Sequence, residues 1–186
     1  YGFSLVGRPE RGAWRDADGV FRLFGDGFDL VLRPQVRVPG EHNVYNILAA
    51  SLAAASSGVP GPVIERAISL FRGVEHRIEF VRELDGVRYY NDSKATNVGS
   101  TVVALRSMDR PVHLILGGRD KGASYDPLLP LIRDRVKTVL LIGEAAPVIR
   151  AAVQGVGVSV CDAGVLERAV GVARTIAKEG EVVLFS

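Results

Sequence analysis

The sequence predicts an α/β protein made of a β-then-helical part followed by a mostly parallel sheet with flanking helices and an N-terminal hairpin. Between residues 112 and 185, apolar runs rich in Val, Ile and Leu alternate with helical stretches, which is typical of a parallel sheet covered by helices on both faces. Residues 1–40 lack this alternation and hold short β-type runs between Gly, Pro and Asp turns. With 186 residues, 47% of them hydrophobic, the chain can form a sizeable core.

The charge balance limits the classes of partner. The 23 basic and 21 acidic residues give a net charge of +2, so no broad cationic surface is available for a nucleic acid or an anionic membrane. No apolar run reaches the roughly 18 residues that span a bilayer. We therefore expect neither a nucleic-acid nor a membrane partner, and any anion site must be local. The single Cys161 cannot form an intrachain disulfide, which is compatible with the cytoplasm, where we expect the protein.

Residues 1–73 are predicted to form an antiparallel β region and then two helices. The helix that starts at Glu41 carries apolar residues at helical spacing and ends where Gly58 and Pro60 supply a stop. A second helix is expected over about 62–71, and Gly73 begins a linker. The β-type runs lie at 3–6, 20–24 and 29–33. We place a domain boundary at this linker, which gives domains 1–73 and 74–186.

The second domain is predicted to begin with a hairpin. Runs at 77–84 and 87–90 flank Asp85-Gly86, a dipeptide that favours a type I′ turn. Four further strands are expected at 112–116, 138–142, 156–160 and 182–185, and helices near 97–106, 127–134, 144–153 and 164–178. Ligands of such sheets bind at the carboxyl ends of strands, which is where we look for chemistry.

A polar segment, Asn91 to Asn97, follows the hairpin. Asp92 can accept hydrogen bonds from ligand hydroxyls, Lys94 supplies a point charge, and Ser93 and Thr96 offer hydroxyls just before a helix whose free amides favour anions. The pattern suits a phosphate or a carboxylate. In the alternative interpretation, Asp92, Ser93 or Thr96 only caps that helix.

A glycine-containing segment, residues 117–122, follows the next strand. Its paired glycines allow a ligand to approach the backbone, and Lys121 brings a charge to the strand end. It is not a phosphate-binding P-loop, because Lys121 is followed by Gly122 where that motif needs Ser or Thr. The alternative is a tight turn with a solvated lysine.

Two other pairs could bind a ligand. Asn43 and Asn46 lie three residues apart near a helix start, where their carboxamides could contact the edge of a base. His76 and Arg77 lie in the linker, where a ring could stack and a guanidinium could bind phosphate. A helix cap with a surface asparagine, and an ordinary exposed linker pair, are the respective alternatives. His113, within an apolar strand, is interpreted as structural.

In this order and spacing, these segments resemble the Mur ligases of peptidoglycan precursor synthesis, and in particular the branch that adds D-glutamate. The resemblance covers roughly residues 40–186, whereas residues 1–39 fit by position alone. The most specific string is Asp-Ser-Lys-Ala-Thr-Asn at 92–97. The other segments that carry the resemblance are Gly40-Glu-His-Asn-x-x-Asn46, His76-Arg77 and Leu116-Gly-Gly-x-Asp-Lys121.

The resemblance implies an ATP-dependent, ADP-forming ligase that joins D-glutamate to UDP-N-acetylmuramoyl-L-alanine. ATP with Mg²⁺ phosphorylates the substrate carboxylate, and the incoming amine attacks the acyl phosphate to form an amide. Residues 1–73 would be the end of the central ATP-binding domain, and 74–186 a C-terminal Rossmann-like domain that binds the amino acid and is truncated at its end. A cytoplasmic monomer with small-molecule substrates is expected.

The resemblance also implies roles for single residues. Lys94 would act next to the transferred phosphate. Asn43 and Asn46 would contact adenine, and His76, Arg77 and Asp92 the rest of the nucleotide. Thr96 and Lys121 would hold the carboxylates of D-glutamate, although Arg119 and Asp120 make the spacing before Lys121 the least regular part of the motif.

Two features set limits to this interpretation. No P-loop and no metal-supporting lysine segment occurs, so we expect the triphosphate and Mg²⁺ ligands outside this chain, no metal ligand within it, and no catalysis by this piece alone. Its abrupt start and end suggest a fragment. The remaining alternatives are a noncatalytic Rossmann-like module that binds a small anion, and a sister Mur ligase that uses another amino acid.

Overall fold

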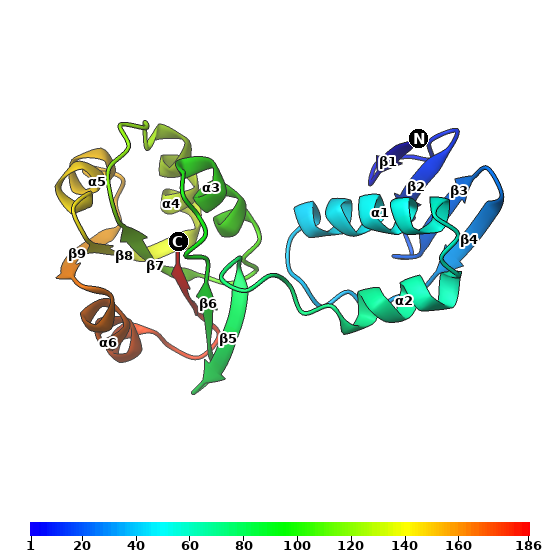
Figure 1. Cartoon of the computed structure of the whole chain (residues 1–186). Helices are drawn as coiled ribbons and strands as arrows, with labels where there is room; N and C mark the ends of the chain where they lie inside the picture. The colour runs from blue at the N-terminus through cyan, green and yellow to red at the C-terminus, as the bar shows by residue number, and fades with distance from the viewer. The chain divides into compact units, whose positions relative to one another are not determined.

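A computed structural model describes residues 1–186, which form two compact units, Tyr1–Gly73 and Val74–Ser186 (Figure 1). The first unit has a four-stranded sheet in the order β1-β2-β3-β4 and two helices. Its elements are β1 (Gly2–Ser4), β2 (Gly12–Arg15), β3 (Phe21–Gly25), β4 (Phe28–Leu32), α1 (Glu41–Ser56) and α2 (Gly61–Leu70). The two predicted helices are confirmed to within a residue or two at each end.

The β region of this unit differs from the prediction in two respects. β2 was not predicted, and it pairs with β1 in parallel, so the expected wholly antiparallel arrangement holds only for β2, β3 and β4. β2 is four residues long and begins Gly-Ala, two residues with weak strand preference, which explains why its pattern gave no signal. α1 and α2 cover the sheet through a common core that includes Phe21, Leu23 and Leu48.

The second unit is a six-stranded sheet in the order β5-β6-β10-β7-β8-β9. β5 is antiparallel to β6, and every other pair is parallel. The last strand of the chain therefore lies inside the sheet, between β6 and β7. The elements are β5 (Glu79–Leu84), β6 (Val87–Asn91), α3 (Val98–Arg106), β7 (Val112–Gly117), a short 3₁₀ turn (Asp126–Leu128), α4 (Leu129–Arg135), β8 (Val136–Ile142), α5 (Ala146–Val153), β9 (Ser159–Gly164), α6 (Leu166–Ile176) and β10 (Val182–Phe185).

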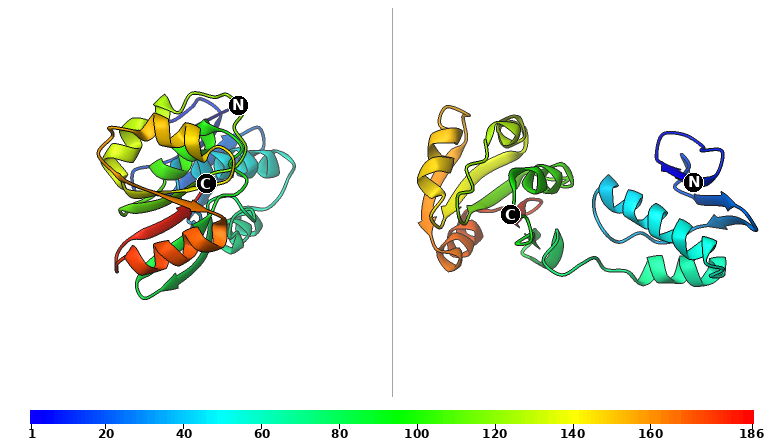
Figure 2. Two further views of the ribbon diagram at one scale, coloured as in Figure 1. Left: turned by 90° about the vertical axis from the view of Figure 1, so that its left-hand side faces the viewer. Right: turned by 45° about the horizontal axis from the view of Figure 1, so that its top comes forward.

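Helices cover both faces of this sheet, as the alternating strands require. Leu114 and Leu116 of β7 belong to the larger core, with residues of α3, α4 and α5, whereas Ile115 between them belongs to a core with Ala169 and Ala173 of α6. In Figure 1 and Figure 2, α3, α4 and α5 accordingly lie on one side of the sheet and α6 on the other. The predicted fold class, a mostly parallel α/β sheet with flanking helices, is confirmed.

The N-terminal hairpin is confirmed together with its turn. Asp85 and Gly86 have φ values of 52° and 74°, the positive values that a type I′ turn requires at both central residues. The strand predicted at 156–160 is displaced, because β9 starts only at Ser159. Residues Gly155 and Gly157 before it have φ of 81° and 87°, so this part of the run turns instead of extending.

A charged cluster around the buried carboxylate of Glu181 ties together the amino-terminal ends of three strands. The carboxylate of Glu181, just before β10, accepts hydrogen bonds from His113 Nε2 of β7 at 2.8 Å and from the ammonium group of Lys137 in β8. Burial alone would raise the pKa of Glu181, but the bonds from Lys137, His113 and the Lys178 amide outweigh it and lower this pKa from 4.5 to about 2. His113 is thus structural, as interpreted, with a partner 68 residues away.

Glu181 is expected to stabilise the fold in a pH-dependent manner. Because its folded pKa lies below the unfolded value, its contribution is complete above pH 4.5 and is lost as the pH falls toward 2. Glu181→Gln should therefore lower the free energy of unfolding at neutral pH by about 2 to 3 kcal/mol, and the deficit should shrink in acid. Urea unfolding at a series of pH values tests this, with the exposed Glu179→Gln as control. A deficit that does not change with pH would contradict it.

Candidate functional site

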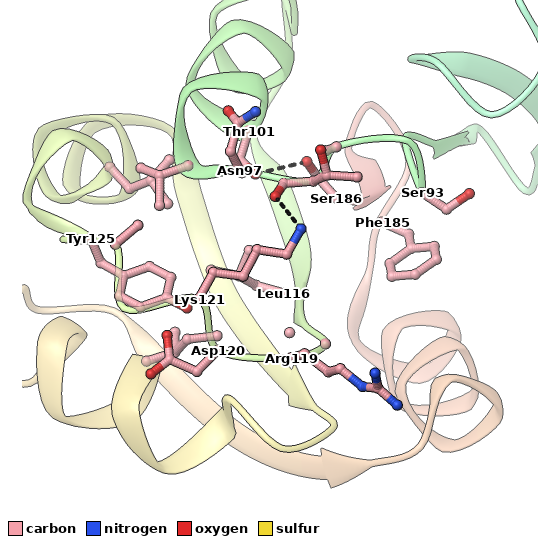
Figure 3. Close-up of a pocket in the computed structure, with 18 residues that line it drawn as sticks. Ser93, Asn97, Thr101, Leu116, Arg119, Asp120, Lys121, Tyr125, Phe185 and Ser186 are labelled. Carbon is pink, nitrogen blue, oxygen red and sulfur yellow. Dashed lines mark hydrogen bonds between the residues drawn. The ribbon is translucent and has the colours of Figure 1, made fainter.

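A pocket of about 280 Å³ lies where the carboxyl ends of β6, β10 and β7 meet (Figure 3). Its walls come from the polar segment after β6, the start of α3, the glycine-containing segment 117–122 after β7, here called the glycine loop, and the end of β10. Its polar lining residues are Ser93, Thr96, Asn97, Thr101, Arg119, Asp120, Lys121, Tyr125 and Ser186. The two segments singled out in the sequence thus share one pocket, although 19 residues lie between them.

Two residues expected to hold the same ligand are in contact across this pocket. The ammonium group of Lys121 donates a hydrogen bond to the backbone carbonyl of Thr96 at 3.1 Å. Figure 3 shows the Lys121 side chain extending across the pocket to reach it. Both residues are exposed, and a bound anion can therefore reach the ammonium group and the Thr96 hydroxyl.

The glycine loop owes its shape to a close approach of the ends of β7 and β8. A Cβ atom on Gly117 would lie 1.9 Å from the carbonyl oxygen of Ile142 in β8, so no other residue fits without moving the backbone. Gly118 has φ 113°, which L side chains rarely adopt. Asp120 then closes the turn by accepting the Gly122 amide hydrogen at 3.0 Å. The paired glycines thus bring Lys121 close to the sheet edge.

Asp120, Tyr125 and Arg119 also line the pocket. Burial raises the pKa of the Tyr125 phenol, with a smaller contribution from the Asp120 carboxylate, so Tyr125 stays protonated and can donate a hydrogen bond at neutral pH. Arg119 is exposed and points away from Lys121 in Figure 3. The loop carries two cationic side chains, Arg119 and Lys121, and one carboxylate, Asp120, so its net charge is positive and attracts an anion.

The polar segment after β6 is fixed by its own hydrogen bonds. Asn97, and not Asp92, Ser93 or Thr96, caps α3, since its side chain accepts the Ser100 amide hydrogen at 2.9 Å. The alternative interpretation, in which Asp92, Ser93 or Thr96 caps this helix, is therefore wrong. Asp92 is only 4% exposed, and its Oδ1 accepts the backbone N–H of Ile78 at 3.0 Å.

The other predicted residues of this unit lie next to the pocket and do not line it. Lys94 is exposed, and its amide donates to the His76 carbonyl at 3.0 Å. The His76 ring is hydrogen bonded to the side chain of Asn91 at 3.0 Å, and Arg77 is exposed. The polar segment and the linker pair are thus joined by hydrogen bonds at the start of the second unit.

Asn43 and Asn46 belong to α1 in the first unit. Gly40 occupies the N-cap position of this helix, so Asn43 is not a cap. Its amide group instead donates to the Pro39 carbonyl at 2.7 Å, which fixes its orientation. Asn46, one turn further along, is exposed.

Three pocket residues were missed in the sequence: Thr101, Tyr125 and Ser186. Ser186 follows the apolar run of β10 as Asp92 follows β6, so the same search of strand ends could have found it. Thr101 and Tyr125 gave no comparable signal, because they lie within a helix and in a loop beyond the glycine turn.

The chain shows neither a cluster of metal-ligating side chains nor a membrane-spanning helix. Nowhere do three or more His, Cys, Asp or Glu side chains gather as a metal ion would need. No helix has the length and apolarity to cross a membrane.

The chain is similar to known ligases over most of its length. A family model described as "Mur ligase, glutamate ligase domain" matches residues 76–186. A UDP-N-acetylmuramoylalanine–D-glutamate ligase of Geotalea daltonii is 49% identical over 150 residues, which cover 81% of the chain and 33% of that relative. The ligase of the same name from Syntrophus aciditrophicus is 40% identical over 185 residues, 99% of the chain and 41% of the relative. The chain thus spans less than half the length of these relatives.

A solved structure supports the fold. The UDP-N-acetylmuramate-alanine ligase of Thermotoga maritima matches with a TM-score of 0.66 at 18% identity, over 94% of this chain and 40% of that one. At this identity the likeness concerns the arrangement of helices and strands.

Gly117→Ala should disrupt the pocket from its base. The added methyl group would collide with the Ile142 carbonyl and force β7 and β8 apart at their ends, at a cost of about 3 kcal/mol. Gly171→Ala is the matched control, because this helical glycine has open space around its Cβ position and alanine favours helix. Denaturant unfolding of both variants measures the difference. Equal stabilities would show that the close approach at Gly117 is not a constraint.

Proposed function

The chain belongs to the Mur ligase family, and on this premise we propose that it is part of a ligase that adds D-glutamate to UDP-N-acetylmuramoyl-L-alanine. The residues matched by the family model form the second unit almost completely. The identities of 40% to 49% to D-glutamate ligases support this choice among the family members.

The contact between Lys121 and Thr96 carries the proposal. These residues come from different loops, and the sheet brings them to one pocket with a net positive lining. D-Glutamate has two carboxylates and one amine, so a site for it needs cations and hydroxyls on the acid groups while the amine stays free to react. Lys121, the Thr96 hydroxyl and the first amides of α3 offer these contacts to a carboxylate.

For this reaction the enzyme has to align the substrates and neutralise their charge more than it has to supply reacting groups of its own. A carboxylate of UDP-N-acetylmuramoyl-L-alanine attacks the γ-phosphate of ATP, which gives an acyl phosphate and ADP. The amine of D-glutamate then attacks the acyl carbon, and phosphate leaves as the amide forms. Lys94, exposed beside the pocket, is the residue we propose to neutralise charge on the transferred phosphate.

We propose five residues as contacts of the nucleotide. Asn43 and Asn46 would bind the base; the bond from Asn43 to Pro39 holds its carboxamide in place for this. His76, Arg77 and Asp92 would bind the phosphates and ribose. Arg77 is exposed and available for this role, whereas Asp92 already holds the Ile78 amide and can share only part of its carboxylate.

The organisation of the whole protein is part of the proposal. Residues 1–73 would be the end of the central ATP-binding domain and 74–186 the amino-acid-binding domain. ATP is the phosphoryl donor, with Mg²⁺ bound by residues other than these, and the 186 residues alone are expected to be inactive. We propose a cytoplasmic monomer with small-molecule substrates and neither nucleic-acid nor membrane partners.

The test is phosphate release by the full-length protein with ATP, Mg²⁺ and UDP-N-acetylmuramoyl-L-alanine. Each candidate acceptor is added separately: D-glutamate, L-glutamate, L-alanine and meso-diaminopimelate. Stimulation by D-glutamate alone is the expected result. Stimulation by another acceptor would point to a sister ligase, and no turnover with any acceptor would favour a noncatalytic anion-binding module.

Lys121→Ala in the full-length protein should raise the KM for D-glutamate about 10- to 100-fold, since a hydrogen bond to a charged group is lost. The KM for ATP should stay within about twofold, because Lys121 belongs to the amino-acid pocket. Lys178→Ala is the control, an exposed lysine whose side chain lies outside the pocket. Equal effects on both substrates would contradict the assignment.

A further inference from the structure

Three buried polar side chains form a network behind the pocket. The Ser186 hydroxyl donates to Asp92 Oδ2 at 3.2 Å and lies 3.0 Å from the Thr101 hydroxyl. Asp92, Thr101 and Ser186 are 4%, 4% and 6% exposed. They come from three elements, since Asp92 follows β6, Thr101 lies in α3 and Ser186 follows β10. Figure 3 shows Thr101 and Ser186 side by side at the pocket wall.

The network continues into the linker at the start of the second unit. Asp92 Oδ1 accepts the amide hydrogen of Ile78 at 3.0 Å. Ile78 has φ 44° and His76 has φ 64°, values that are costly for residues with side chains and most of all for a β-branched one. The Glu79 carboxylate accepts the His76 amide hydrogen at 2.8 Å. Carboxylates therefore hold this strained turn through its backbone amides.

We propose that Thr101 and Ser186 are positioning residues that fix the carboxylate of Asp92, and through it the strained linker turn at His76–Ile78. Ser186 holds one oxygen of Asp92, which leaves the other oriented toward Ile78. Thr101 in turn holds Ser186. The same two residues line the pocket, so a ligand that orders the pocket also orders the turn.

The energetics favour a positioning role over simple packing. Burying a carboxylate and two hydroxyls costs free energy that apolar side chains of similar size would avoid. What this burial achieves is a fixed orientation of the Asp92 carboxylate, because hydrogen bonds at both oxygens prevent rotation about the Cβ–Cγ bond. A turn with two non-glycine residues at positive φ persists only where its surroundings hold it in place.

The first experiment needs no ligand and does not depend on the proposed function. Hydrogen–deuterium exchange of the full-length protein is followed in peptides that overlap at residues 76–80. Thr101→Val removes the hydroxyl and keeps the shape, and it should speed exchange at Ile78 about fivefold, the effect of one lost hydrogen bond. Thr101→Ser should restore the slow rate. Ser186→Ala should behave like Thr101→Val.

Thr175→Val is the matched control, since the Thr175 hydroxyl makes a hydrogen bond of its own, to the Val172 carbonyl, but lies on α6, outside the network. It should leave exchange at Ile78 unchanged. Exchange at Ile78 that is as slow in Thr101→Val and Ser186→Ala as in the wild type would overturn the proposal. Faster exchange spread evenly over the whole second unit would also overturn it, because it would show general destabilisation.

The second experiment rests on the proposed function and tests the link to the pocket. D-Glutamate at saturation should slow Ile78 exchange in the wild type and in Thr101→Ser, and should do so at least threefold less in Thr101→Val. In steady-state assays, Thr101→Val should lower kcat more than it raises the KM for D-glutamate, since the variant keeps Lys121 and Thr96. Equal slowing in all variants would overturn the link to the pocket. Failure of D-glutamate to act on the wild type would instead overturn the proposed function, while the ligand-free result stands.

Discussion

The insertion of β10 between β6 and β7 is the constraint on which the site depends. Strands in a sheet lie about 4.8 Å apart, so one intervening strand separates the ends of β6 and β7 by about 10 Å. That gap is wide enough for a small dicarboxylate and narrow enough for Lys121, on the β7 side, to reach the Thr96 carbonyl on the β6 side. Ser186, at the end of the inserted strand, lies between them. If β10 were at the sheet edge, β6 and β7 would be neighbours and their loops would close on each other.

Contacts at the amino-terminal ends of the strands hold β10 in this position. Glu181, just before β10, has its carboxylate bonded to His113 of β7 and to Lys137 of β8. Ser186, just after β10, belongs to the network with Asp92 and Thr101, so the strand is held immediately outside both of its ends. The Glu181 carboxylate is buried at one end, and the Asp92 carboxylate with two hydroxyls at the other, while the strand between them is apolar. The carboxyl ends of the strands, where the pocket lies, can therefore carry glycines and polar loops that contribute little to stability. The contacts at the amino ends hold the register of the strands.

Much of the second unit could be predicted from the sequence, because apolar β-branched runs, the Asp85-Gly86 turn and the helix stops are local signals. The position of β10 could not, since no local pattern distinguishes an inserted parallel strand from one added at the edge. The same holds for the bond between His113 and Glu181, which joins distant segments. For the site, strand-end reasoning found both loops that line the pocket. It missed Thr101, because a buried hydroxyl within a helix has the same sequence pattern whether it supports a site or only packs.

The two loops contribute different properties, and the difference follows from how each is held. The segment at 91–97 is fixed by the Asn97 cap, the turn at Asp92 and the bonds to the linker, so its backbone is oriented before a ligand arrives. Lys121 is held only by one exposed hydrogen bond to a carbonyl, which a carboxylate can replace with a stronger, charge-assisted one. A rigid wall and one movable cation let the pocket bind an acid group without first breaking a costly interaction. Ser186 is bonded to Asp92 of this segment and to Thr101. On our proposal a ligand that contacts these residues therefore acts on the linker, whereas the movement of Lys121 does not.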